Sequence, residues 1–259
     1  MLRALNTAAT GMVAQQTNID VTANNMANVN TTGFRRARAE FQDLVYQTVR
    51  APGGRTGDGG TLPTGVQLGQ GTRTVSTTLI HSQGSLQQTD GPMDLAIEGD
   101  GYFQVQRPTG ELAYTRSGNL HADAEGNLVT VDGLAIEPNI TIPLDATAIT
   151  VTADGTISVQ VAGQPNAQEV GRLQLAGFAN PQGLLATGRS LFDQTDASGQ
   201  PIVATPGQEG LGTIAQGFLE GSNVEVVNEM IDLISSQRAY DINQKVIEAA
   251  DEMLKRITR

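Results

Sequence analysis

The segment 123–127 carries side chains that a calcium ion prefers. Its sequence, Asp-Ala-Glu-Gly-Asn, supplies oxygen ligands from Asp123, Glu125 and Asn127. A helix–loop–helix calcium site needs ligands spread over about twelve residues and a terminal Glu, and that pattern is absent here. The same residue types also favour tight turns between strands. The segment therefore predicts a hairpin turn rather than a calcium site.

Two glycine-rich triplets resemble fragments of phosphate-binding loops. They are Gly-Gln-Gly at 69–71 and Gly-Asp-Gly at 99–101. A phosphate loop has more glycines at a fixed spacing and opens into a helix, whose first N–H groups hold the phosphate. Neither triplet has that spacing or a helix after it, so both triplets predict turns.

The side chains that run most nucleophilic, acid–base and metal chemistry are scarce. The chain has no cysteine, so it can form neither a disulfide nor a thiolate metal site. Its two histidines, His81 and His121, have no neighbouring motif of a general base or a metal ligand. A Ser-His-Asp set is a spatial arrangement, but no motif points to one. We predict that the protein is not an enzyme and has no cofactor.

The charge balance disfavours nucleic acids and anionic membranes as partners. The chain has 27 acidic and 16 basic residues, which gives a net charge of −11. Binding to phosphate backbones or anionic lipids needs a surplus of Lys and Arg. The small basic run Arg35, Arg36 and Arg38 favours an ion-paired strand over a nucleic-acid patch. Solubility alone also accounts for the acidity.

No segment has the composition of a membrane span or a secretory signal. A spanning helix needs about 20 apolar residues, and no stretch of the sequence approaches that length. The N-terminal segment 1–20 contains Arg3 but no continuous apolar core, so it does not read as a signal peptide. We expect no direct membrane insertion, and any export by a route that leaves the N-terminus intact.

Apolar heptad repeats lie near both ends of the chain, on either side of the turns predicted above. A heptad of apolar residues places them on one seam of a helix that packs against another helix. The repeats predict helices over 3–28 and 222–259, about 40 and 50 Å long. The seam residues are Leu5, Met12, Ile19 and Met26 near the N-terminus, and Val226, Leu233, Tyr240, Ile247 and Leu254 near the C-terminus.

The ends of both predicted helices carry recognisable signals. An asparagine-rich run leads to Gly33, and both residue types tolerate the left-handed conformation that closes helices. Ser222 and Glu225 fit a capping box at the start of the second helix. A seam of nine apolar residues is thin against the entropy of ordering two long helices. We therefore expect both ends to be loose in the monomer and to order against neighbouring copies.

Between the helices the apolar period changes to two, which is typical of strands. Turn residues at 99–101 predict a hairpin of 93–98 with 102–106, and those at 153–155 predict another, of 148–152 with 156–160. Further strands are expected over 169–178 and 212–218. The stretch 51–71 is too rich in glycine for a helix and predicts an extended loop or linker.

These elements predict an α+β fold. The long N- and C-terminal helices form a coiled-coil-like inner layer, and a mainly antiparallel β domain is inserted between them. The predicted domains are a terminal helical domain (1–34 and 222–259), connecting regions (35–75 and 192–221) and an outer β domain (76–191).

Four segments, in order along the whole chain, together resemble the bacterial flagellar rod and hook proteins. They are 23–34, 94–103, 114–120 with 126–129, and 221–230 with 237–240 and 243–245. The residues that carry the resemblance are Asn24, Asn25, Asn28, Asn30, Thr32, Gly33, Phe34, Gly99, Gly101, Asn223, Arg238, Tyr240 and Asn243.

The resemblance implies a structural subunit of the basal-body rod that spans the periplasm. Many copies would form a rigid hollow homopolymer, which transmits torque from the motor to the hook and carries the export channel. Its partners would be other rod proteins and the hook protein along the axis, the periplasmic and outer-membrane bushing rings, and the flagellar type III export apparatus. The two terminal helices would serve as the assembly interface.

Within this family, length and segment 46–71 favour the distal part of the rod over a proximal subunit. The segment contains Pro52, Gly53, Gly54 and Pro63 and has no apolar pattern with which to fold alone. We hypothesise that it lies across neighbouring subunits and stiffens the rod. Outside the family, the alternative is a soluble β-domain binding protein or adhesin with a helical stalk, which would have folded ends in the monomer.

Overall fold

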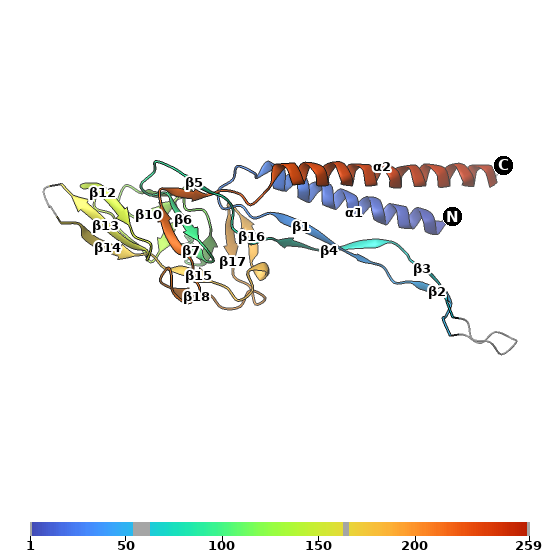
Figure 1. Cartoon of the computed structure of the whole chain (residues 1–259), viewed down its shortest axis with the longest axis horizontal. Coiled ribbons are helices and arrows are strands. Elements are labelled where there is room, and N and C mark those ends of the chain that lie inside the picture. Colours follow the sequence, from blue (N-terminus) through green and yellow to red (C-terminus); the bar gives the residue numbers. More distant parts are fainter. Residues whose placement is uncertain (1, 54–62, 163–165, 258–259) are drawn as a thin grey trace. The chain divides into compact units, whose positions relative to one another are not determined.

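The computed structural model describes residues 2–53, 63–162 and 166–257, and Figure 1 shows their helices and strands. Contacts divide the chain into two compact units. The helix–arm unit comprises Met1–Ala27, Ala37–Thr78 and Glu225–Arg259, and the β unit comprises Asn28–Arg36 and Leu79–Val224.

Two long antiparallel helices, α1 (Leu2–Ala27) and α2 (Val226–Ile257), lie side by side in the helix–arm unit (Figure 1). Polar pairs fix their register. The Asn18 amide donates to the Ser236 hydroxyl over 2.7 Å, and the Asn25 amide donates to a Glu229 carboxylate oxygen over 3.1 Å. The partners advance by seven residues on α1 and retreat by seven on α2, so the heptad repeat is present on both helices.

The predicted capping box at Ser222 and Glu225 is wrong. Helix α2 begins at Val226, because the Glu225 carbonyl accepts the first helical hydrogen bond, from the Glu229 N–H. The Ser222 hydroxyl instead accepts from the Val224 N–H, only two residues ahead. Ser222 therefore closes a local turn before the helix, and Glu225 occupies the cap position.

A hairpin arm extends the helix–arm unit. Strand β1 (Ala37–Asp43) pairs with β4 (Thr72–Leu79), and β2 (Gln47–Arg50) pairs with β3 (Val66–Leu68). The expectation of a loop or linker over all of 51–71 is therefore wrong for β3. Its backbone pairs with β2 in the register Gln47↔Leu68, so cross-strand hydrogen bonds order a strand that has no buried side chains.

Antiparallel sheets build the β unit. The strand order of the nine-stranded sheet is β16-β17-β8-β7-β11-β10-β9, with β15 beside β7 and β18 beside β15. Its strands are β7 (Tyr102–Gln106), β8 (Leu112–Thr115), β9 (Leu120–Ala122), β10 (Leu128–Thr130), β11 (Ala135–Glu137), β15 (Leu175–Gly177), β16 (Leu185–Gly188), β17 (Leu191–Asp193) and β18 (Ile202–Ala204).

Smaller sheets complete the unit. A three-stranded sheet contains β12 (Ala146–Val151), β13 (Thr156–Val161) and β14 (Gln168–Arg172). Two strand pairs join β5 (Leu86–Gln88) to β20 (Phe218–Glu220), and β6 (Leu95–Glu98) to β19 (Thr213–Gln216). A short 3-10 helix, η1 (Pro181–Gly183), precedes β16.

One predicted hairpin is confirmed and the other is wrong. Strands β12 and β13 pair across the turn at 153–155, in the register Val151↔Ile157. Strands β6 and β7 do not pair: β6 pairs with β19, and β7 lies in the nine-stranded sheet. The turn at 99–101 is a corner instead, because the Gly99 and Gly101 carbonyls accept hydrogen bonds from the Arg116 side chain.

Two further sequence predictions are refined. The segment 169–178 forms β14 and β15 in different sheets, and 212–218 contains β19 and the start of β20. The turn predicted at 123–127 is confirmed. There the Asp123 carboxylate accepts from the N–H groups of Glu125 and Asn127, which lowers the pKa of Asp123.

The core of the β unit is mainly aliphatic. Its fully buried side chains include Ile97, Phe103, Val105, Val159 and Leu175. Beside it, an aromatic cluster packs edge to face, with the Tyr114 and Phe178 ring centroids 4.8 Å apart. No helix in the described ranges is apolar enough over a sufficient length to span a membrane.

Candidate functional site: the junction of three segments

The chain passes between the two units four times, after Ala27, Arg36, Thr78 and Val224. On the β side of these crossings lie the segments 28–36, 79–85 and 220–224. We call these three segments the junction. All three belong to the β unit and are hydrogen-bonded to one another, although long stretches of sequence separate them.

Backbone hydrogen bonds form the first layer of the junction. The Gly33 N–H donates to the Glu220 carbonyl over 2.9 Å, and the Ile80 N–H donates to the Arg36 carbonyl over 2.8 Å. Gly33 has a φ of 68°, and a Cβ there would lie 2.7 Å from the Ser117 nitrogen. Only glycine fits both the angle and the approach.

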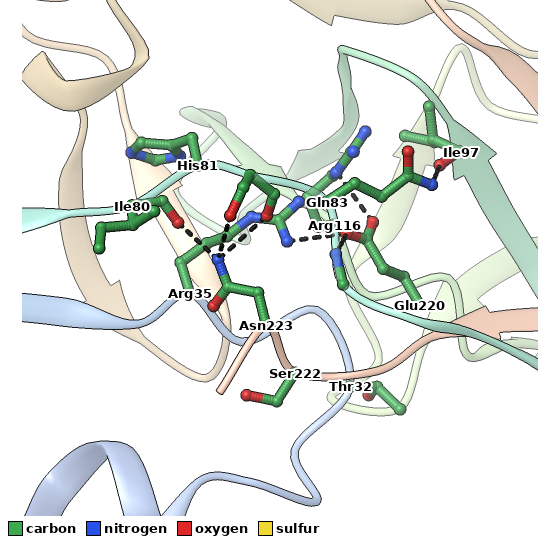
Figure 2. Close-up of polar contacts among 12 residues, drawn as sticks. Thr32, Arg35, Ile80, His81, Gln83, Ile97, Arg116, Glu220, Ser222 and Asn223 are labelled. Atoms are coloured by element: carbon green, nitrogen blue, oxygen red, sulfur yellow. Dashed lines mark hydrogen bonds and ion pairs between the residues drawn. The ribbon is translucent and has the colours of Figure 1, made fainter. Parts of the chain in front are cut away.

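Glu220 is the buried centre of the junction (Figure 2). One carboxylate oxygen accepts from Arg35 Nη1 over 2.7 Å and from the Gly84 N–H over 2.9 Å. The other oxygen lies 3.0 Å from Arg116 Nε, an ion pair whose angle is too bent for a hydrogen bond. The carboxylate thus connects three segments: β20, the exit from α1, and the loop before β5.

Arg116 extends this network into the β unit. Its Nη1 atom donates to the Gly101 carbonyl over 2.7 Å, and its Nη2 atom donates to the Gly99 carbonyl over 2.6 Å. Burial lowers the pKa of Arg116, and the Glu220 charge opposes that shift. Removing one member of a buried ion pair leaves an uncompensated charge, which is strongly destabilising. The network therefore fixes the geometry of the junction.

Asn223 ties the returning chain to the other two segments. Its Oδ1 atom accepts from the Arg36 N–H over 2.7 Å, and its Nδ2 atom donates to the carbonyls of Ile80 and Ser82 over 2.7 and 3.0 Å. An amide both accepts and donates, so it can replace a strand partner at this point. Nearby, the hydroxyls of Thr32 and Ser117 share a hydrogen bond of 3.1 Å.

His81 lies beside the two arginines and stays neutral near pH 7. Burial, followed by the positive charges of Arg35 and Arg116, lowers its pKa to about 4. Its Nδ1 atom is 2.7 Å from the Tyr102 hydroxyl, its only hydrogen-bond partner among the described residues. A cavity of about 220 Å³ opens beside these four side chains. The arrangement holds segments together, and no serine or threonine hydroxyl of the described residues is hydrogen-bonded to the imidazole.

The described residues contain no group of three or more His, Asp or Glu side chains placed to hold a metal ion. The interpretation of the basic run as ion-paired is confirmed for two of its residues. Arg35 pairs with Glu220, and Arg38 pairs with Glu40 in β1 over 2.9 Å.

The apolar seam residues flank a smaller, more polar stripe between α1 and α2. Leu5, Met12, Ile19, Met26, Leu233, Tyr240, Ile247 and Leu254 are half-buried, and Val226 is exposed. The side chains buried most deeply on the two helices include Thr22, Asn25, Glu229, Ser236 and Ala250. Small and polar residues therefore occupy the centre of the helix pair.

Other predicted residues occupy helix ends and the arm. Asn24, Asn28 and Asn30 lie at the end of α1 and in the turn after it, and Phe34 is half-buried in the junction. Arg238 is exposed on α2, whereas Asn243 lies against Gly11 of α1. In the arm, Pro52 and Gly53 form a turn after β2, and Pro63 is exposed. Gly54 lies outside the described residues.

Sequence reasoning missed Arg116, Glu220 and Glu229. Each is a charged residue that the structure buries, and the sequence places none of them near its partner. Arg116 and Glu229 belong to segments that resemble the flagellar family, and Glu220 does not.

The helix–arm unit exposes many large apolar side chains. On α2 these are Val226, Val227, Met230, Ile231, Ile234, Ile242, Val246 and Met253. On the arm they are Phe41, Val45, Tyr46, Val49, Val66, Leu68 and Val75. Large exposed apolar surfaces mark interaction sites.

The sequence is similar to known protein families and to individual known proteins. Three family profiles match: "Flagella basal body rod protein" at residues 5–35, "Flagellar hook protein FlgE/F/G D1 domain" at 96–159, and "Flagellar basal body rod FlgEFG protein C-terminal" at 215–259. The chain is 50% identical to the flagellar basal-body rod protein FlgG of Caulobacter vibrioides over 254 residues, which cover 98% of this chain and 97% of that protein.

FlgG of Buchnera aphidicola, from the subspecies of Acyrthosiphon pisum, is 48% identical over the full length of both chains. FlgG of Agrobacterium fabrum is 48% identical over 97% of each chain.

Proposed function

Because the chain belongs to the FlgG family of flagellar basal-body rod proteins and is a structural subunit of that rod, we propose that it builds the distal part. In this proposal, copies stack as a rigid hollow homopolymer that transmits torque to the hook. The helix pair forms the inner layers around the export channel, and the β unit faces outward. The full-length similarity to FlgG proteins and the arm at 46–71 support this placement over a proximal position.

The exposed apolar face of α2 is the observation that carries the assembly proposal. Val227, Ile231 and Ile234 recur at i, i+4 and i+7, so they share one face of the helix. All three are exposed in the single chain, at 65%, 59% and 46% of their surface. Burying each side chain in a helix of a neighbouring copy is favourable by about 1.5–3 kcal/mol.

The arm has a similar surface, which supports its proposed role as a stiffening element. Val45 and Val49, just before and within β2, and Val66 and Leu68, within β3, are all exposed. Two paired strands have no second layer, so they cannot bury these side chains in a core. We propose that the arm lies across neighbouring subunits and resists their sliding. Its cross-strand hydrogen bonds hold the apolar side chains ready for that contact.

The remaining partners belong to the same proposal. Assembly with rod and hook components is a property of the family, and the rings around the rod and the flagellar export apparatus are proposed here as further partners. Export would leave α1 in place. Asn18 and Asn25 of α1 form hydrogen bonds with α2. This pairing supports an export route that does not cleave α1, because α1 is then part of the helix pair that assembles.

Hydrogen exchange tests the proposal directly. Purified monomer and polymer are compared residue by residue. If α2 is a polymerisation element, the amides of 226–257 exchange more slowly in the polymer, and those of β7 and β8 are unchanged. Equal protection of α2 in a polymer and in dilute monomer would contradict the proposal, and would favour a self-contained helical stalk.

A further inference from the structure

The two-residue turn between β16 and β17 has an unfavourable backbone for its sequence. Arg189 and Ser190 both have positive φ, at 57° and 56°. Such turns strongly favour Asn-Gly or Gly-Gly, because a side chain at positive φ crowds its own backbone. Backbone strain that persists in a folded protein is a reason to look for a role of the strained residues.

The structure accounts for Ser190. Its hydroxyl donates to the Thr32 carbonyl over 3.3 Å, and its own carbonyl accepts from the Thr115 hydroxyl over 2.9 Å. The turn is therefore attached to the exit from α1 and to β8. The first of these contacts requires a hydroxyl at position 190, whereas the second uses a backbone carbonyl that any residue would supply.

Nothing comparable accounts for Arg189. Its side chain is exposed and makes neither an ion pair nor a hydrogen bond with any described residue. Glycine at this position would adopt the turn without strain. Among the described residues, therefore, no contact within the chain accounts for an arginine here.

Arg189 lines a cavity of about 270 Å³ in the β unit. Hydroxyl side chains from Thr32, Ser117 and Thr130 also line it, and so does the Asn119 amide. Arg189 is the only cation among the lining residues. Asp132 is the only anion, and it forms no ion pair with Arg189.

We propose that Arg189 and this cavity receive a carboxylate side chain of a second copy of the chain in the rod. A guanidinium presents parallel N–H donors that match the two oxygens of a carboxylate, and the hydroxyls offer further donors. A second copy supplies that group readily, because the chain has 27 acidic residues against 16 basic ones. The inference rests on the proposed polymer and adds a contact of the β unit to those of the helices and the arm.

The test is the critical concentration for polymerisation of purified protein, measured by pelleting at low salt. We expect Arg189→Gly to raise it about tenfold, as the loss of one charge-assisted contact predicts. The thermal unfolding midpoint of the monomer should stay the same or rise, because glycine relieves the turn. In about 1 M salt, where the Debye length is about 3 Å, the variant and the wild type should converge.

Two further variants make the test specific. Arg172→Ala removes another exposed cation, which lies outside this cavity. It should leave the critical concentration unchanged. Asp132→Asn removes the negative charge beside the incoming carboxylate, so it should lower the critical concentration or leave it unchanged.

The outcomes separate this inference from the proposed function. If the wild type forms no polymer, the proposed function fails and the inference fails with it. If the wild type polymerises and Arg189→Gly does so at the same concentration, only the contact is overturned. A higher critical concentration for Asp132→Asn would also overturn it, since the cavity would then take a cation.

Discussion

The Asn25 side chain on α1 donates a hydrogen bond to Glu229 on α2, 204 residues away in the sequence. The same amide also pairs with both backbone groups of Ala37, accepting from its N–H over 2.9 Å and donating to its carbonyl over 2.8 Å. One buried side chain thus fixes the register of the helices and the start of the arm. Asn25 therefore has a structural role in the helix–arm unit of this chain.

Replacing Asn25 with Ala should lower the free energy of unfolding by about 2–4 kcal/mol. The change removes three hydrogen bonds and leaves buried partners without their donor or acceptor. Urea unfolding followed by circular dichroism measures the effect. Asn30→Ala, at an exposed asparagine of the same run, is the matched control and should change stability by less than about 0.5 kcal/mol. Equal effects of the two variants would contradict the role assigned to Asn25.

Replacing Glu220 with Gln should destabilise the β unit by about 3–5 kcal/mol. Both arginines would lose the charge that compensates their burial. Near-ultraviolet circular dichroism of the tyrosines Tyr102 and Tyr114, which lie in this unit, reports its unfolding. Arg172→Ala, which breaks an exposed contact with Asp154, should cost less than about 1 kcal/mol. A loss of the same small size for Glu220→Gln would show that the junction does not depend on the ion pair.

Stability should fall between pH 6.5 and pH 4 because of His81. Its pKa is about 4 in the folded chain against an ordinary value of 6.5, so the unfolded chain takes up the proton first. Stability is therefore complete above pH 6.5 and is lost as the pH falls through this window. Allowing for partial exposure to solvent, we expect about 2 kcal/mol.

His81→Gln is the variant that isolates this contribution. Glutamine does not titrate and can still accept a hydrogen bond from the Tyr102 hydroxyl. The difference in unfolding free energy between wild type and variant, measured in urea at pH 7 and at pH 4.5, removes the contribution of the carboxylates. A difference that does not change with pH would show that His81 is not buried as a neutral group.

Two charge insertions on α2 should have different effects. Leu233 lies on the side of α2 that packs against α1. Leu233→Asp should therefore disrupt the helix pair in the monomer as well as assembly, because an aspartate cannot be buried there unpaired. Ile231→Asp is exposed and should stop assembly while the monomer keeps its helix content. Sedimentation velocity and circular dichroism of both variants distinguish these results. If Ile231→Asp still forms rods, the exposed face of α2 is not part of the interface between copies. If Leu233→Asp still forms rods, the assignment of Leu233 to the packed seam is wrong.

Deleting 51–66 should make the rod more flexible without stopping its assembly. The deletion removes β3 residue Val66 and shortens the arm, so fewer apolar side chains reach neighbouring copies. The persistence length of purified rods in electron micrographs measures the change. A shorter deletion confined to 54–62 is the control that leaves β2 and β3 intact. Rods as stiff as the wild type after the longer deletion would show that the arm does not restrict sliding.

The sequence predicted the elements whose signals are local. The heptads of Leu233 and its neighbours identified α2, and the Ala153-Asp154-Gly155 turn identified the β12–β13 hairpin. The prediction of a β6–β7 hairpin was wrong. Gly99 and Gly101 look the same in the sequence whether the segment turns back into a paired strand or forms a corner held by an arginine. The Arg116 side chain binds the carbonyls of both glycines and so stabilises the corner. That contact forms only when the chain folds, so the local sequence does not reveal it. The centre of the junction was missed for the same reason, since Arg35 and Glu220 lie 185 residues apart.

The junction makes the β unit exchangeable. Arg36, Ile80 and Asn223 are joined by hydrogen bonds, so the chain leaves and re-enters at neighbouring points. A domain of a different size or surface, spliced in just beyond these residues, would keep the same three bonds at its base. The inserted domain can therefore change in size and sequence, while the points at which the chain leaves and re-enters it stay joined.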